Sequence, residues 1–342
     1  MNILLCPPDI LLQHPREEWK ELQQNTPVLI ATCSSQTESV LNHMGEGFSF
    51  LFYENFDDNP LVEMDIYHYA QANRAAGIYF LAENDVLRAA RISDRLGLTL
   101  AREKNARLFR NKFMMKSLVK EHQLKIPAMA RADSATAIAR FIAEHGYPCV
   151  IKANDGCASQ AAVILKNEGQ LYKYLSQMPP PVYHNLLIEK FIDGEAYQIN
   201  ALYLKNQPIC LSASRAAVSG LGALAAKGSV SNIKDDKPLR RRLIAYARYL
   251  AEHVFPTEEN TLLHLNVLID KEGHIIFDEL ACCLGGGAVN EELKAAFGLD
   301  PRMTWLKACM KNTYPQDMSQ RMPVLLPGQR NIAVYGVKQT IH

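Results

Sequence analysis

FDELACCLGGG, residues 277–287, is the stretch on which the interpretation of this 342-residue chain depends most. Two acidic residues end an apolar segment, two adjacent cysteines follow, and three glycines close the stretch. The pattern fits four interpretations: a metal site on carboxylates, a metal site on thiolates, a glycine-rich phosphate loop, or a strand that runs into a turn. The rest of the sequence has to decide among them.

The composition is that of a soluble globular protein, with 48% hydrophobic and 21% charged residues. The length predicts about two or three domains. A net charge of +1 gives no general attraction to nucleic acid or to an anionic membrane. The apolar runs are too short to span a bilayer, so we expect neither nucleic acid nor a membrane as a partner.

The eight cysteines show no CxxC spacing, and several lie in apolar runs. This usage favours reduced thiols over a disulfide framework. The N-terminal MNILLCPPDILL lacks a basic segment and is interrupted by Pro7 and Pro8, so it makes a poor signal peptide. We therefore expect a cytoplasmic protein. A soft metal on Cys282 and Cys283 stays an alternative, although neighbouring side chains of a strand point to opposite faces.

Residues 27–98 alternate short apolar runs with helical patterns. Strands are predicted at 27–31, 48–52 and 77–81, and a helix over 83–97 with Gly97 at its C-terminal end. This order predicts a small doubly wound domain. A dinucleotide site is not expected in it, because GxGxxG is absent.

The following part of the chain changes its periodicity from helices to strands. Apolar positions at helical spacing predict helices near 109–118 and 138–145, and strand patterns start at Cys149. The fold class is therefore mixed, α/β with α+β. We predict four units: a Rossmann-like domain over 1–100, a small subdomain over 101–185, a C-terminal subdomain over 186–311, and a Pro-rich tail over 312–342.

The apolar segments 262–269 and 274–280 flank a turn at 270–273 and predict a hairpin. The simplest register pairs 269 with 274, which places His264 opposite Glu279 and Asn266 diagonally beside it. Imidazole, amide and carboxylate on one face predict a platform for Mg²⁺. A solvated outer face of an antiparallel sheet is the alternative.

A second candidate site surrounds Lys152, which ends a buried strand before a loop of small residues that includes Gly156 and Ser159. A lysine in this place suits a phosphate, because backbone N–H groups of small residues can approach the same anion. An ordinary strand-end lysine is the alternative, and Lys112 in the preceding amphipathic helix is less specific still.

Two carboxylates bracket the linker after the strand 186–190. Glu189 ends the strand, and Glu195 follows the turn residue Gly194. Adenine needs an acceptor for its amino group, and ribose hydroxyls prefer a carboxylate, so the pair suits a nucleoside. A hairpin with surface acids is the alternative.

Together and in this order, these segments resemble the ATP-grasp superfamily, in particular its biotin carboxylase-like and carboxylate–amine ligase branches. The resemblance covers about residues 83–300 and implies an ATP-grasp fold preceded by a Rossmann-like domain. The segments that carry it are Glu83–Gly97, Asn111–Lys112, Lys125–Pro127, Tyr147–Lys152, Glu189–Glu195, Asn266 and Asp278–Glu279.

The resemblance also implies a role for each matching residue. The phosphates of ATP would be held by Lys112 and Lys152 under a flap at 154–160, which contains Gly156 and Ser159. Metal-binding positions correspond to Asn266 and Glu279, for Mg²⁺ with Mn²⁺ as the alternative ion. The adenosine contacts would be Glu189 for the amino group, the backbone of Lys190, Phe191 and Ile192 for the ring edge, and Glu195 for ribose.

The implied activity is an ATP-dependent ligase that joins a carboxylate to an amine through an acyl phosphate. Arg215 and Lys227 lie near the segment in which relatives carry cations for that intermediate, and such ligases are commonly homodimers. Relatives usually read Glu-x-Asn-x-Arg where this chain has Glu279, Ala281 and Cys283. The alternative function is therefore a catalytically degenerate ATP-grasp that binds a nucleotide or a partner.

Overall fold

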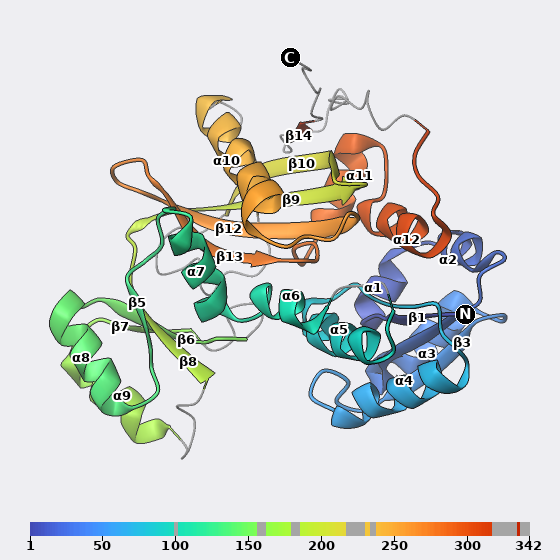
Figure 1. Cartoon of the computed structure of the whole chain (residues 1–342), viewed down its shortest axis with the longest axis horizontal. Coiled ribbons are helices and arrows are strands. Elements are labelled where there is room, and N and C mark those ends of the chain that lie inside the picture. Colours follow the sequence, from blue (N-terminus) through green and yellow to red (C-terminus); the bar gives the residue numbers. More distant parts are fainter. Residues whose placement is uncertain are drawn as a thin grey trace.

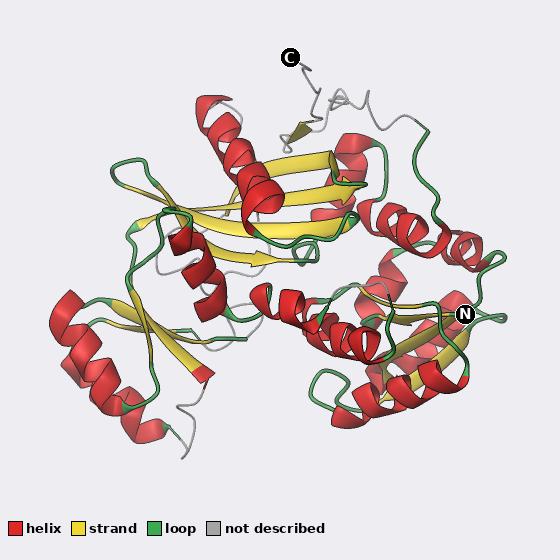
Figure 2. Cartoon of the chain, viewed as in Figure 1, coloured by secondary structure: helices red, strands yellow, loops and turns green. Residues whose placement is uncertain are grey.

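The computed structural model describes residues 1–98, 102–155, 162–178, 185–216, 230–232, 237–316 and 334–335. Strands in these residues form three sheets, and helices pack on each of them (Figure 1, Figure 2). Gly156, Ser159 and Lys227, three of the predicted site residues, lie outside the described residues, as does most of the predicted flap.

The N-terminal sheet is parallel, with the strand order β3-β2-β1-β4. The three predicted strands are confirmed as β2 (Val28–Cys33), β3 (Ser49–Tyr53) and β4 (Gly77–Phe80). The sequence pattern missed β1 (Asn2–Leu5), whose four residues are all buried at the centre of the sheet. A run of four residues is too short to show a period of its own.

Helices cover the N-terminal sheet and follow the predicted alternation. They are α1 (Pro8–Gln13), α2 (Arg16–Gln23), α3 (Thr37–Met44), α4 (Pro60–Ala72) and α5 (Val86–Arg95). The last of these ends as expected, because Gly97 takes a φ of +66° just beyond it. That left-handed conformation strains residues with a Cβ and suits glycine.

A smaller antiparallel sheet has the order β5-β8-β6-β7. Its strands are β5 (Met129–Arg131), β6 (Cys149–Ala153), β7 (Val163–Leu165) and β8 (Leu186–Lys190), with α8 (Ala135–His145) and α9 (Glu168–Gln177) against them. The strand β8 belongs to this sheet because it pairs with β5 and β6, and its Leu187 and Ile188 are fully buried. The sequence division had placed these residues with the following unit.

The largest sheet has the order β11-β10-β9-β12-β13, with β14 paired to β10. Its strands are β9 (Gly194–Leu204), β10 (Gln207–Ala216), β11 (Val230–Asn232), β12 (Thr261–Asp270), β13 (Ile275–Ala281) and β14 (Val334–Tyr335). Since β8 and β9 belong to different sheets, the alternative of a hairpin around Gly194 is wrong.

Three helical segments complete the core of this sheet. They are α6 (Glu103–Leu108), α7 (Lys112–Glu121) and α10 (Lys237–Tyr249), which continues into a π-helical turn over Leu250–Val254. Figure 1 shows α7 at the junction of the two antiparallel sheets. Its buried Met115 and Val119 pack in one cluster with Leu265 and Phe277.

The hairpin of β12 and β13 forms, but its register differs from the predicted one. Ile269 pairs with Ile275 rather than with His274, and after a bulge at Asp278, Asn266 lies directly opposite Glu279. The prediction that His264 faces Glu279 is therefore wrong. A bulge adds one unpaired residue to one strand and cannot be read from apolar alternation alone.

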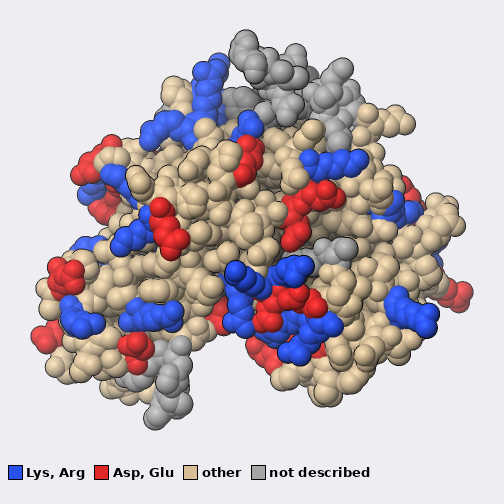
Figure 3. Space-filling model, in the orientation of Figure 1, with Lys and Arg blue, Asp and Glu red and all other residues tan. Residues whose placement is uncertain are grey.

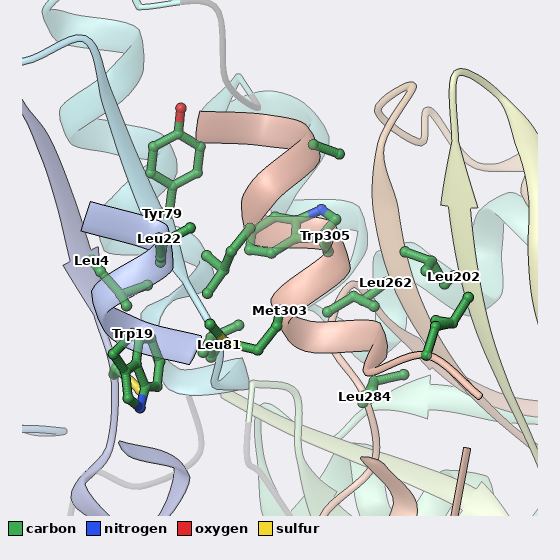
Figure 4. Close-up of a cluster of buried hydrophobic side chains, with 14 of the residues drawn as sticks. Leu4, Trp19, Leu22, Tyr79, Leu81, Leu202, Leu262, Leu284, Met303 and Trp305 are labelled. Atoms are coloured by element: carbon green, nitrogen blue, oxygen red, sulfur yellow. The ribbon is translucent and has the colours of Figure 1, made fainter. Parts of the chain in front are cut away.

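Two C-terminal helices join the largest sheet to the N-terminal domain. They are α11 (Val289–Phe297) and α12 (Pro301–Lys311). Figure 4 shows Met303 and Trp305 of α12 between Leu4, Trp19 and Leu81 on one side and Leu202 and Leu262 on the other. One hydrophobic core therefore spans both parts of the chain.

Charges are mixed on the surface, in keeping with the net charge of +1. On the face drawn in Figure 3, basic and acidic side chains alternate rather than gather in a patch of one sign. None of the helices that the structure describes has the length and apolarity needed to cross a membrane.

Asp300 fixes the start of α12 against the N-terminal domain. Its Oδ1 accepts a hydrogen bond from the Met303 amide, and its Oδ2 lies 3.1 Å from His14 Nδ1 and 3.3 Å from Lys294 Nζ. Burial by itself would raise the pKa of Asp300, but the hydrogen bond and charge of His14 lower it to about 2. A carboxyl group with a lowered pKa stabilises the fold when it is ionised.

We predict that Asp300→Asn lowers the free energy of unfolding at pH 7 by about 2 kcal/mol, the equivalent of the pKa shift. Asparagine still caps the helix, so the loss isolates the charge. The difference from the unchanged chain should vanish as the pH falls from about 4 through about 2. Urea unfolding across this pH range measures it, with the exposed Asp133→Asn as a control without effect. A difference that persists at pH 2 would contradict the assignment.

Candidate active site

Three lysines and three carboxylates from four elements converge between the two antiparallel sheets. Lys112 and Lys116 lie one turn apart on α7, and Lys152 lies near the end of β6. The carboxylates are Glu189 on β8 and the adjacent Asp278 and Glu279 on β13. We call these six residues the charge cluster.

The inner part of the charge cluster is a closed network of four side chains. Lys152 Nζ lies 2.9 Å from Glu189 Oε2 and 2.9 Å from Asp278 Oδ1. Lys116 Nζ lies 2.6 Å from Glu189 Oε1 and 3.0 Å from the same oxygen of Asp278. Each lysine thus contacts both carboxylates, and the four formal charges cancel.

Burial makes this pairing essential. Lys116 is fully buried, Lys152 is 7% exposed and Glu189 is 3% exposed. Removing such ions from water costs several kcal/mol each, a cost that only close counter-charges offset. Burial by itself would lower the pKa of Lys152, but Asp278 and Glu189 raise it above its ordinary value. Burial likewise opposes ionisation of Asp278, yet Lys152 and Lys116 hold its pKa well below the usual range.

The predicted metal residues lie at the outer edge of the charge cluster, where Asn266 adjoins its member Glu279. Asn266 Nδ2 donates a hydrogen bond of 3.0 Å to Glu279 Oε1, and Lys112 Nζ lies 3.2 Å from Glu279 Oε2. Burial tends to raise the pKa of Glu279, but Lys112 lowers it overall. Carboxylate and amide oxygens are suitable ligands for Mg²⁺, so the donor set fits that ion.

The bulge at Asp278 brings two neighbouring carboxylates to the lysines of the charge cluster, Asp278 to Lys116 and Lys152 and Glu279 to Lys112. In a regular strand, consecutive side chains point to opposite faces, and one of the two acids would leave the site. The extra residue lets Phe277 and Leu280 both enter the core while Asp278 and Glu279 both meet lysines. The sequence pattern pointed to Glu279 and not to Asp278 as a site residue, although Asp278 contacts two of the lysines.

The structure holds the remaining predicted nucleotide residues in other contacts. Glu195 and Arg215 are partly exposed and form an ion pair with each other, and Tyr197 Oη donates to Glu195 Oε2 over 2.7 Å. These two residues, to which the resemblance gives separate ligands, neutralise one another. Lys190 instead donates from its side chain to the carbonyls of Gly146 and Tyr147.

The backbone amides of residues 190–192, which the resemblance assigns to an adenine ring, are only partly free to bind a ligand. The amides of Lys190 and Phe191 donate to the carbonyls of Ala128 and Pro148 over 2.8 and 3.2 Å. Within the described parts of the chain, the Ile192 amide has no hydrogen-bond partner. Of the three amides predicted to serve an adenine ring, Ile192 is therefore the one left for a ligand.

The glycines that follow β13 serve packing. The Gly285 amide donates 3.1 Å to Asn200 Oδ1, which also lies 2.8 Å from His264 Nδ1. A Cβ at position 285 would stand 2.7 Å from that histidine nitrogen, whereas one at Gly286 would meet nothing within 4 Å. The His264 ring is thus held by Asn200 and Gly285.

The two adjacent cysteines do not form a thiolate site. Burial raises the pKa of Cys282 to about 12 and that of Cys283 further, so both stay protonated. Among the described residues, neither belongs to a group of three side chains that could hold a metal ion. Their protonation leaves the thiolate interpretation without support.

Sequence reasoning missed Lys116, the most buried member of the charge cluster. A signal was present, since Lys116 follows Lys112 by four residues and lies between the apolar Met115 and Val119. Residues four apart share one face of a helix, so both lysines had to face the same side. A lysine on an apolar stripe needs a buried carboxylate partner, and the sequence alone did not identify one.

We predict that Lys116→Met lowers the free energy of unfolding by about 3–5 kcal/mol, because Glu189 and Asp278 are then left with one lysine. The exposed Lys120→Met on the same helix should change it by about 0.5 kcal/mol or less. Adding Asp278→Leu to Lys116→Met should restore part of the loss. Urea unfolding gives the values, and equal effects of the two lysine variants would argue against the network.

Gly285→Ala should lower the free energy of unfolding by about 1–3 kcal/mol, because the added methyl group overlaps the His264 ring. Gly286→Ala is the matched control and should stay within about 0.5 kcal/mol. Thermal unfolding of the two variants beside the unchanged chain is sufficient. An indistinguishable pair would show that His264 moves away freely.

Known proteins resemble this chain both in a family pattern and in fold. The family model described as an ATP-grasp domain matches residues 109–276. A search of curated proteins gave no match. The matched range ends two residues before Asp278 and includes Lys112, Lys116, Lys152, Glu189 and Asn266.

Solved structures resemble the chain over most of its length. The L-amino acid ligase from Bacillus licheniformis shares 16% identity at a TM-score of 0.69, covering 91% of this chain and 74% of that one. The biotin carboxylase domain of the Hydrogenobacter thermophilus 2-oxoglutarate carboxylase shares 15% at 0.69, covering 92% and 70%.

A third similar structure is N5-carboxyaminoimidazole ribonucleotide synthetase from Thermotoga maritima. It shares 12% identity at a TM-score of 0.63 and covers 94% of this chain and 78% of that one. At such identities the likeness establishes the fold alone. The family model and the shared fold confirm the resemblance drawn from the motifs: residues 109–276 form an ATP-grasp domain.

Proposed function

We propose that this protein is an ATP-dependent ligase that joins a carboxylate to an amine. The observation that carries the proposal is that Lys112, Lys152 and Glu279 of the charge cluster meet beside Asn266, at an ATP-grasp domain. Two lysines near an oxygen-ligand pair match the needs of a magnesium nucleotide, in which phosphate and metal must be bound together.

The charge cluster is neutral as a whole, so a magnesium nucleotide would bind there by an exchange of ion-pair partners. Phosphate oxygens would take the Asp278 position at Lys152 and the Glu279 position at Lys112. Asn266 and Glu279 would then hold Mg²⁺, with Mn²⁺ as a substitute. After this exchange Asp278 would keep its contact with Lys116, and Glu279 would have Mg²⁺ in place of Lys112, so neither carboxylate would lose its counter-ion.

The adenosine would lie against β8 and its linker. Glu189 is proposed to accept from the amino group, the Ile192 amide to donate to the ring, and Glu195 to bind ribose. Glu195 would first have to release Arg215, which would free a guanidinium for the acyl phosphate. Gly156, Ser159 and Lys227 keep their proposed roles in the flap and the substrate loop.

In the proposed reaction, an oxygen of the substrate carboxylate attacks the γ-phosphorus of ATP, and ADP leaves. The nitrogen of the amine then attacks the acyl carbon, and phosphate leaves with loss of a proton from nitrogen. The work of the chain in both steps is positioning and charge neutralisation. The similar structures support this class, because they include an L-amino acid ligase and a biotin carboxylase domain in complex with MgADP and bicarbonate.

Incubation with ATP, Mg²⁺ and pooled amino acids should release phosphate, and Glu279→Gln should abolish the release by weakening the metal site. Glu272→Gln in the exposed turn of the same hairpin is the matched control and should keep full activity. Phosphate release that survives Glu279→Gln would remove the role of Glu279. Tight ATP binding without turnover for any substrate pool would instead favour the degenerate nucleotide-binding alternative.

A further inference from the structure

A cavity of about 340 Å³ lies apart from the charge cluster. It is enclosed by the end of β4, by α6, by the loop that leads into β12, and by α12. None of the six residues of the charge cluster lines it, although Cys282 borders it three positions after Glu279. Its volume falls within the range of about 300–1,000 Å³ that is usual for small-molecule sites.

The lining of this cavity is negatively charged. It includes Glu258 and Glu259 but no lysine, arginine or histidine. Across the described ranges, neither carboxylate has a hydrogen-bond or ion-pair partner. Burial and the neighbouring charge of Glu259 raise the pKa of Glu258 above its ordinary value. Such a shift is typical of a half-buried carboxylate that has no counter-ion among the described residues, whereas Glu259 is exposed to solvent.

Aromatic rings form the apolar walls. Trp305 lies 6.3 Å from Tyr79 in an edge-on arrangement and 6.0 Å from Phe80. Hydrogen bonds fix two of these rings, since Tyr79 Oη donates to the Cys309 carbonyl over 3.2 Å and Trp305 Nε1 to the Asn260 carbonyl over 3.1 Å. Figure 4 shows both side chains, on β4 and α12. The walls are therefore formed before any ligand binds.

The thiols in the lining add no charge at neutral pH. Burial raises the pKa of both Cys282 and Cys309 to about 12. Nor does the lining suit a bare metal ion, since within the described sequence neither glutamate belongs to a group of three potential metal ligands. The cavity thus combines two carboxylates with aromatic faces and lacks the donors of a metal site.

We propose that this cavity binds a small organic cation, a protonated or quaternary amine with an apolar body. Glu258 and Glu259 would neutralise the ammonium group, and the Trp305, Tyr79 and Phe109 rings would cover the body. Aromatic faces attract such cations, and the attraction is stronger where water is excluded. The proposal is independent of the ligase activity, because the cavity is separate from the charge cluster.

The test is calorimetric titration of the full chain, without nucleotide, with three probes of similar size that share a phenyl ring. Phenethylammonium should bind at least about tenfold more tightly than 2-phenylethanol, and 3-phenylpropionate should bind more weakly than either. Equal affinity for the ammonium and the alcohol would overturn the proposal, because it would show an apolar cavity without charge selection. Absence of binding by the ammonium would overturn it as well.

A variant tests the two carboxylates directly. Glu258→Gln combined with Glu259→Gln should weaken phenethylammonium binding about tenfold or more and leave 2-phenylethanol binding unchanged. Glu252→Gln, a residue that pairs with Arg248 and does not line the cavity, is the matched control. Unchanged ammonium affinity in the double variant would overturn the proposal. The comparison of probes on the unchanged chain decides the question even where the substitutions lower stability.

Discussion

The need to balance buried charge controls the centre of this molecule. Lys116 and Lys152 share Glu189 and Asp278, and these four side chains come from a helix and from both antiparallel sheets. No single element supplies both a lysine and its carboxylate partner. The network therefore forms only when α7, β6, β8 and β13 have reached their final places. The cost of desolvating each ion makes any other arrangement of these elements unfavourable. The charge cluster therefore specifies how the two sheets meet, in addition to forming the candidate site.

The bulge in β13 is the local feature that makes this balance possible. With a regular strand, either Asp278 or Glu279 would leave the lysines, and Phe277 or Leu280 would leave the core. The extra residue meets both demands, at the cost of one unpaired position in the ladder. Bulges are frequent beside functional sites for this reason. The bulge thus adds the carboxylate of Asp278 to the expected carboxylate of Glu279. In the same hairpin region, Ala281 and Cys283 stand where the family resemblance leads us to expect Asn and Arg.

The charge cluster and the cavity differ in their charge balance, and the end of β13 separates Glu279 of the cluster from Cys282 of the cavity. The charge cluster is neutral and fully paired, and its use by a magnesium nucleotide requires an exchange of partners. The cavity beside Cys282 carries unpaired negative charge within rigid aromatic walls. Its walls depend on α12, whose position in turn depends on Asp300 and on the hydrophobic core shared with the N-terminal domain. The domain contact thus shapes the cavity.

The sequence by itself determined the superfamily and the order of the elements, because apolar periodicity and the ordered motifs survive in one dimension. It also identified Lys112, Lys152, Glu189, Asn266 and Glu279, which the fold gathers in one place. It could not supply β1, which is too short to show a period, or the role of Lys116, whose carboxylate partners are distant in the chain. The bulge, the contact between Glu195 and Arg215, and the unpaired charge of Glu258 were decided only by tertiary structure. Each depends on which side chains meet across elements, and a linear pattern does not contain that information.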